Sequence, residues 1–146
     1  MGTIQQKWQD EQVPAVDGIF FGSDEFIPLD GAADSGYTVG VRQPVATIVL
    51  RWAMVVEAVR VSDEGRDLRV HGGETPWEGS GFIAAVMAST GHLRWLFQLS
   101  ASEAFVEVET DGVVVRAVSG GYPVRYQWSI PIHEPEKFTV ERIRAA

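Results

Sequence analysis

The sequence predicts an all-β fold, a single-domain antiparallel meander of about 8–10 short strands closed as a barrel or stacked as a sandwich. Three stretches carry this prediction, namely residues 82–99, 105–118 and 124–132. In each of them apolar residues recur at every second position, which is typical of half-buried strands. The first two stretches are each interrupted by a glycine-containing turn, so consecutive strands are expected to pair as hairpins.

The first third of the chain gives a weaker pattern. Residues 1–12 are polar and are expected to form either a flexible arm or a short helix. Between residues 13 and 40, glycine, aspartate and proline separate short apolar pieces, which indicates two or three short strands. Residues 45–61 are ambiguous between strand and helix, but their valines and their poor helical stripe favour strands.

Two hairpins can be given an expected register. In the first, Ser89-Thr90-Gly91 forms the loop, so that Ala85 faces Trp95 and Ile83 faces Phe97. In the second, a two-residue turn at Asp111-Gly112 would place Glu107 opposite Arg116. A final strand is expected over residues 138–143. The alternation then predicts a buried core that includes Trp95, Phe97, Val106, Val108, Val115, Trp128 and Ile130.

Length and composition exclude several classes of protein. The 146 residues suit one domain, 1–146, and the absence of cysteine excludes disulfides and thiolate chemistry. No stretch approaches the ~20 apolar residues of a membrane span, and the N-terminus lacks a signal-peptide layout. We therefore expect a cytoplasmic protein without a membrane partner.

The charge is negative and unevenly distributed. The formal net charge is −8, and the first 36 residues contribute −6 of it, with seven acidic residues against Lys7. Such a surface disfavours nucleic acid and could recruit a basic protein partner, with Asp24 and Glu25 among the contact residues. The alternative is that these carboxylates only keep the protein soluble.

The segment 71–81 holds the densest group of unusual residues. Its four glycines and one proline argue against regular structure, and Glu74, Trp77 and Glu78 share the segment. One interpretation is a binding loop with Trp77 as an apolar platform and the glutamates as polar contacts. The other is a long connection whose tryptophan covers the core.

Motifs for catalysis, metals and nucleotides are missing from the sequence. His71, His92 and His133 fit no metal-ligand spacing and are expected to be surface or turn residues. Neither a phosphate-binding glycine loop nor a serine-nucleophile elbow is present, so we expect no cofactor and no catalytic residue.

Two functional hypotheses remain. The first is a non-catalytic interaction protein, of an accessory or immunity/antitoxin-like kind, which recognises another protein through the acidic face or the 71–81 loop. The second is a small-molecule-binding β-barrel that encloses a hydrophobic ligand, and that could be a cofactor-free enzyme. Between these two, the sequence favours the non-catalytic protein, because no residue pattern supports catalysis.

Overall fold

The computed structural model describes residues 2–121 and 123–144 and confirms an all-β, antiparallel fold. One short α-helix, α1 (Thr3–Gln9), precedes the strands, as one of the two expectations for the N-terminus foresaw. The strands are β1 (Gln12–Pro14), β2 (Gly18–Phe20), β3 (Glu25–Ala32), β4 (Gly36–Val39), β5 (Gln43–Pro44), β6 (Trp52–Met54), β7 (Val56–Asp63), β8 (Leu68–Glu74), β9 (Gly81–Val86), β10 (Leu93–Leu99), β11 (Phe105–Thr110), β12 (Val114–Gly120), β13 (Val124–Pro131) and β14 (Thr139–Arg144). Three 3₁₀ turns lie at Val45–Thr47, Glu64–Arg66 and Pro135–Lys137.

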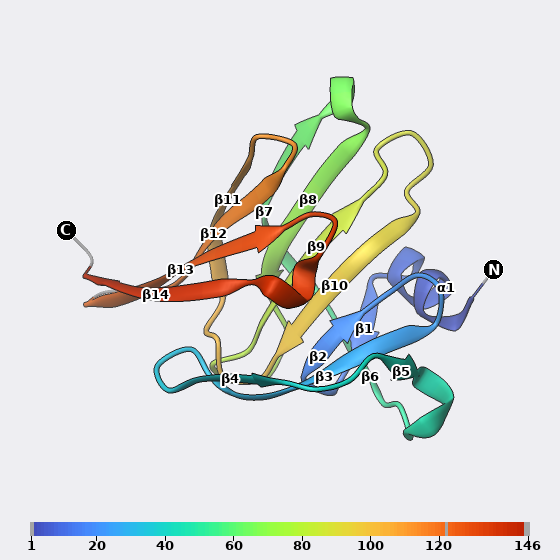
Figure 1. Ribbon diagram of the computed structural model, residues 1–146, viewed down its shortest axis with the longest axis horizontal. Coiled ribbons are helices and arrows are strands. Elements are labelled where there is room, and N and C mark those ends of the chain that lie inside the picture. The colour runs from blue at the N-terminus through green and yellow to red at the C-terminus, as the bar shows by residue number, and fades with distance from the viewer. Residues whose placement is uncertain (1, 122, 145–146) are drawn as a thin grey trace.

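The strands pair in three sheets. A large sheet of eight strands follows the order β4-β3-β2-β10-β9-β8-β7, with β5 attached to β3. A second sheet has the order β11-β12-β13-β14, and β1 pairs with β6 alone. In Figure 1 the second sheet, orange to red, lies across one side of the large sheet, and α1 lies at the right of the view beside β1. Strands β7 to β10 and β11 to β14 are each a meander of consecutive neighbours, as alternation predicted.

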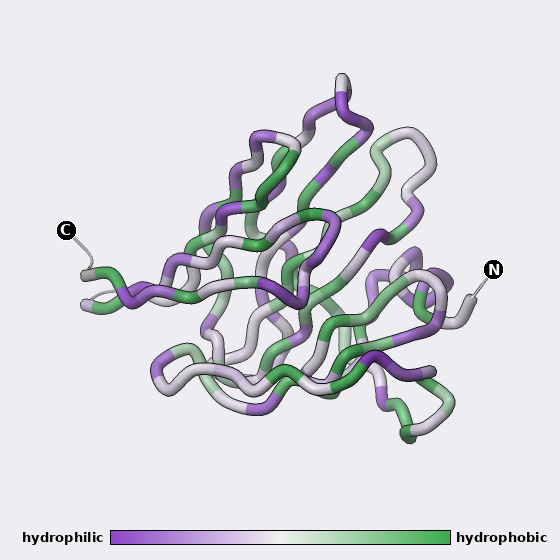
Figure 2. Tube along the Cα trace, in the orientation of Figure 1, coloured by the Kyte–Doolittle hydropathy of each residue, from purple (hydrophilic) through white to green (hydrophobic). Residues whose placement is uncertain are grey.

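The large sheet is covered on both faces. On one face, Trp95 and Phe97 of β10 pack with Phe105, Trp128 and Ile130 from the second sheet. On the other face, residues such as Phe82 and Leu96 pack with Ile4 of α1 and Val13 of β1. In Figure 2 hydrophobic positions recur along these strands, and hydrophilic ones gather at the β7–β8 turn at the top of the view. The two-sided cover explains why β9 reads as a continuous apolar run rather than an alternating one.

The hairpin β9–β10 forms largely as expected. Ala85 pairs with Trp95 and Ile83 with Phe97, and Gly91 has the positive φ of 75° that the loop requires. The register shifts between Leu93 and Trp95, so the pairing next to the turn differs from the expected one.

The hairpin β11–β12 corrects the expected register. Glu109, not Glu107, lies opposite Arg116, and Thr110 pairs with Val115. The reason is local: the Asp111 carboxylate accepts hydrogen bonds from the backbone N–H groups of Val113 and Val114, both at 2.9 Å. The turn therefore centres one residue later than expected.

The predicted core is confirmed except at one position. Trp95, Phe97, Val115, Trp128 and Ile130 are buried. Val108 is half-buried against the core, but Val106 is 37% exposed, so its predicted burial is wrong. A bulge between Phe105 and Glu107 turns Phe105 inward in its place. The ambiguous segment 45–61 is a 3₁₀ turn followed by β6 and most of β7.

Candidate functional site

The β8–β9 connection, residues 75–80, is held in place by buried hydroxyl groups. Thr75 and Ser80 are 2% and 1% exposed, and their hydroxyls hydrogen-bond to each other. Ser80 Oγ also donates to the Trp77 carbonyl at 2.7 Å. From the neighbouring connection, the Glu103 N–H donates to the Gly79 carbonyl at 2.7 Å. The connection is thus fixed at both ends, although it contains no regular structure.

This fixed loop presents an indole to solvent. Trp77 is 53% exposed, and Glu74 and Glu78 on either side of it are exposed as well. Glu103 brings a third carboxylate beside the loop, because a β-carbon built on Gly79 would lie 3.8 Å from its Oε1. Trp77 and Glu78 lie in this loop, whereas Glu74 is the last residue of β8, so the irregular segment expected over 71–81 begins only at residue 75. Glu103 was not foreseen.

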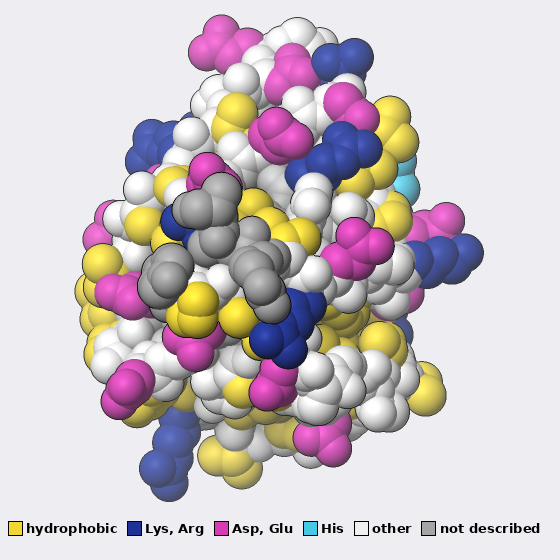
Figure 3. Space-filling view, turned by 90° about the vertical axis from the view of Figure 1, so that its left-hand side faces the viewer, with side chains coloured by type: hydrophobic (Ala, Val, Ile, Leu, Met, Phe, Trp, Pro, Cys, Tyr) yellow, Lys and Arg dark blue, Asp and Glu magenta, His cyan; other side chains and the backbone are white. Residues whose placement is uncertain are grey.

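Asp24 and Glu25 lie elsewhere and have partners within the fold. Asp24 accepts hydrogen bonds from the N–H groups of Thr3 and Ile4, at 3.0 and 2.9 Å, and so caps the first turn of α1. Glu25 forms an ion pair with Arg42 at 3.2 Å. Figure 3 shows carboxylates interspersed with basic and apolar side chains over one side of the molecule, without a continuous acidic area on that side.

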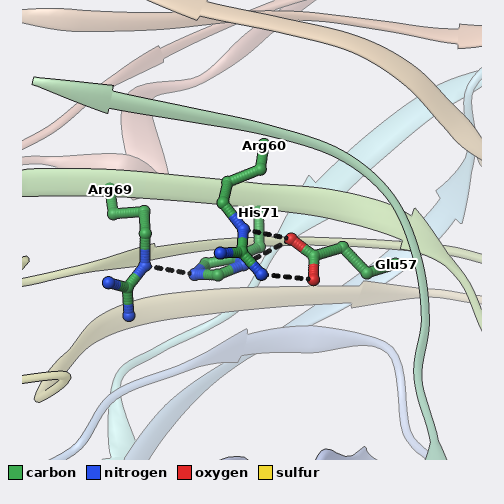
Figure 4. Close-up of polar contacts among 4 residues, drawn as sticks. All are labelled: Glu57, Arg60, Arg69 and His71. Atoms are coloured by element: carbon green, nitrogen blue, oxygen red, sulfur yellow. Dashed lines mark hydrogen bonds and ion pairs between the residues drawn. The ribbon is translucent and has the colours of Figure 1, made fainter.

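A second polar cluster joins β7 and β8 and was missed in the sequence. It consists of Glu57, Arg60, Arg69 and His71, drawn in Figure 4. His71 was expected at the surface or in a turn, but it lies within β8 and is 7% exposed, which corrects that prediction. It lies edge-on to the Trp8 ring of α1, with the ring centres 5.4 Å apart.

A β-bulge assembles this cluster. Residues three apart on a regular strand point to opposite faces. Here Glu57 pairs with Gly73 and Arg60 pairs with His71, so both side chains reach the same face. Gly73 permits the bulge, because a β-carbon there would overlap the Val56 carbonyl oxygen and come within 2.9 Å of Ala58 N.

Hydrogen bonds within the cluster define its charge state. Arg60 binds the Glu57 carboxylate through Nε at 2.8 Å and Nη2 at 3.0 Å. His71 Nδ1 lies 2.8 Å from Glu57 Oε1, and Arg69 Nε lies 2.9 Å from His71 Nε2. Because Arg69 can only donate, Nε2 must accept, which leaves the imidazole neutral with its proton on Nδ1.

The pKa values follow from these contacts. Hydrogen bonding to Arg60 lowers the pKa of Glu57 to about 2, against a smaller raising effect of burial and with further help from His71. Burial lowers the pKa of His71 below its ordinary value of 6.5, although Glu57 pulls it upward.

The arrangement suits binding better than proton transfer. A carboxylate that orients a histidine is found in catalytic sites, where the second ring nitrogen faces the substrate. In this protein that nitrogen is occupied by Arg69. A single signal could have pointed to the cluster: the adjacent Gly72 and Gly73 inside a strand, which often mark a bulge.

Comparisons with known proteins identify no family for this chain. No protein-family model matches it, and no significant match to it was found among curated proteins or among solved structures. Within residues 2–121 and 123–144, no helix is long and apolar enough to cross a membrane. Over the same residues, no group of three or more histidine, aspartate or glutamate side chains is placed to hold a metal ion.

Proposed function

We propose that the protein is a non-catalytic interaction module that binds a basic segment of another protein through the 75–80 loop and its flanking carboxylates. The observation that carries the proposal is the 53% exposure of Trp77 on a loop fixed by buried hydroxyl groups. Binding through a large exposed indole on a rigid support loses little conformational entropy. Tryptophan is also enriched at interface hot spots.

The surroundings of Trp77 indicate the partner's chemistry. Glu74, Glu78 and Glu103 provide acidic groups around the indole. An arginine side chain can stack on an indole and pair with carboxylates at the same time. The overall charge of −8 would also attract a basic partner over a distance.

Asp24 and Glu25 have a smaller part in this proposal than in the sequence hypothesis. Their carboxylates are engaged by the N-terminus of α1 and by Arg42. They contribute long-range attraction rather than direct contacts.

The stacked arrangement of sheets is the one we propose as the scaffold for this loop. It is supported by the core that the two larger sheets share, and by the strand path of the large sheet, which runs from β4 to β7 without a pairing between those two strands. The space that a barrel would offer a ligand is filled here by aromatic side chains such as Trp95, Phe105 and Trp128. This favours an external binding surface over the enclosed ligand of the second hypothesis.

The test uses an arginine-rich peptide as the probe and compares three variants with the parent protein. Trp77→Ala is expected to weaken binding at least about tenfold, which corresponds to about 1.4 kcal/mol. The triple variant E74Q/E78Q/E103Q is expected to weaken it and to reduce its salt dependence. The matched control is E64Q/E109Q/E141Q, which changes the net charge equally at exposed glutamates outside the loop.

Two results would refute the proposal. One is binding that Trp77→Ala leaves unchanged while chemical denaturation shows the variant folded. The other is an equal loss in the two triple variants, which would mean that net charge alone attracts the peptide.

A further inference from the structure

A pocket of about 340 Å³ opens beside the Glu57–His71 cluster, on the face of the large sheet that α1 covers. Its lining includes Trp8, Glu11, Arg69, His71, Phe82 and Thr90, and we refer to it as the Trp8 pocket. The volume is at the small end of the range for ligand-binding pockets, so it suits a compact ligand with a single ring. Trp77 does not line it, so this site is independent of the loop discussed above.

The apolar walls of the pocket are held in position. The Trp8 ring lies edge-on to His71 and is tilted against Phe82, with ring centres 5.4 and 6.2 Å apart. Helix α1 carries Trp8 and is anchored by Ile4, which is 1% exposed. At the rim, the Val55 N–H donates to the Glu11 carbonyl at 3.0 Å, which ties the end of the helical arm to the strand β7 region.

Arg69 supplies a charged group that the fold leaves available. Glu57 neutralises Arg60, but Arg69 has no carboxylate within ion-pair distance in the part of the chain that the structure describes. Its Nε is fixed by His71 at 2.9 Å, which orients the guanidinium plane. Figure 4 shows its two terminal nitrogens turned away from Glu57. An oriented guanidinium fork with free N–H groups matches a carboxylate.

The remaining charges restrict the ligand further. Arg60 and Arg69 are balanced by Glu11 and Glu57 among the lining residues, so the wall is formally neutral. A ligand with two negative charges would face the Glu11 carboxylate with no further cation to compensate. A single carboxylate on an apolar ring satisfies both the guanidinium and the aromatic walls.

We infer that the Trp8 pocket binds a small aromatic monocarboxylate, whose ring packs against the half-buried Trp8 indole and whose carboxylate pairs with Arg69. His71 acts as a positioning residue, because it holds the guanidinium through Nε2. This is a binding role and involves no chemical step.

The experiment titrates three probes of the same shape into the protein, namely phenylacetate, phenylacetamide and phenethylamine. Calorimetry gives the affinities, and the Trp8 indole N–H resonance, assigned with a Trp8→Phe variant, reports the place of binding. Phenylacetate is expected to bind saturably and to shift that resonance. The neutral amide is expected to bind at least tenfold more weakly, and the amine not at all.

Variants identify the side chain that binds the carboxylate of the ligand. Arg69→Gln is expected to bring phenylacetate down to the affinity of the amide, and Arg69→Lys to retain part of the difference. The matched control is Arg51→Gln, which removes an exposed arginine that does not line the pocket. If Arg69→Gln does not fold, Trp8→Leu tests the inference instead, because it removes the aromatic wall and leaves the guanidinium. Phenylacetate should then bind more weakly than to the parent protein.

The inference is overturned if phenylacetate gives no saturable shift, if the amide binds as tightly as the acid, or if Arg51→Gln weakens binding as much as Arg69→Gln. A preference for the amine would assign the pocket to cations, with Glu11 as the recognising group, and would also overturn it.

Discussion

Arg69 Nε donates a 2.9 Å hydrogen bond to His71 Nε2, and this contact exists only while the imidazole is neutral. A second proton on His71 would place two donors against each other at that distance. It would also add a charge between Arg60 and Arg69, with only Glu57 to offset it among the groups that contact His71. The cluster is therefore built for the neutral form.

The first prediction is that the protein loses stability when His71 becomes protonated. Because burial lowers the pKa of folded His71 below 6.5, the unfolded chain takes up the proton first as the pH falls. The stabilising contribution is complete above about pH 6.5 and is lost below it. Urea denaturation midpoints measured between pH 7.5 and 5 should fall in the parent protein.

The His71→Gln variant is the control for this prediction. Its midpoint should be lower at pH 7.5 but should change less between pH 7.5 and 5, because glutamine does not titrate. Glu57 does not affect the slope in this range, because its pKa is lowered from 4.5 to about 2 by folding. Its stabilising contribution is complete above about pH 4.5 and is lost only as the pH falls towards 2. Equal slopes in parent and variant over the upper range would contradict the assignment to His71.

The outcome at β9–β10 and β11–β12 shows what local sequence can specify. Gly91 fixes one turn by its positive φ, so Ala85 and Trp95 pair as expected. At the other turn, Asp111 caps the N–H groups of Val113 and Val114, a side-chain contact that the Asp-Gly pattern does not specify. The pairing then shifts by two positions, and this even shift leaves Val108 and Val115 on their predicted face, whereas the bulge between Phe105 and Glu107 turns Val106 outward.

The polar cluster could not have been read from the sequence in the same way. Glu57 and His71 are fourteen positions apart, and Trp8 comes from the N-terminal helix α1. Their proximity depends on the pairing of β7 with β8 and on the docking of α1. In contrast, Trp77 and its neighbouring glutamates are local in the chain, so composition alone could group them.

The second prediction concerns the bulge that brings Glu57 and Arg60 together. Gly73→Ala should destabilise the protein by about 3 kcal/mol, because the new β-carbon meets backbone atoms of Val56 and Ala58 that no side-chain rotation can move. Gly65→Ala is the control, since its nearest neighbour, Asp63 Oδ1, would be 3.6 Å away. Urea unfolding of both variants decides it: a similar small effect of about 0.5 kcal/mol in each would show that β7 has no fixed bulge.

The third prediction separates two uses of acidic residues. Asp24 has a φ of 64° and caps α1, so Asp24→Gly should remove the cap without backbone strain and cost about 1 kcal/mol. Asp24→Asn should cost less, because one acceptor oxygen remains. The exposed pair Asp30 and Asp34, changed together to asparagine, should alter stability by no more than about 0.5 kcal/mol. Thermal denaturation at fixed pH measures all three, and equal effects would mean that Asp24 is only a surface charge.

The last prediction compares two neighbouring residues at the start of β11. Strict alternation places Val106 inside, but the bulge between Phe105 and Glu107 reverses the two positions. Phe105 is fully buried, and its ring packs edge-on against Trp128 with 5.3 Å between centres. Phe105→Ala should therefore cost about 3–5 kcal/mol, as truncation of a packed aromatic residue does. Val106→Ala should change the free energy of unfolding by no more than about 0.5 kcal/mol, because the side chain is already partly in water.

Urea unfolding of the two single variants gives both values directly. The opposite ranking would mean that β11 is a regular strand with Val106 in the core, and that the bulge does not form in solution.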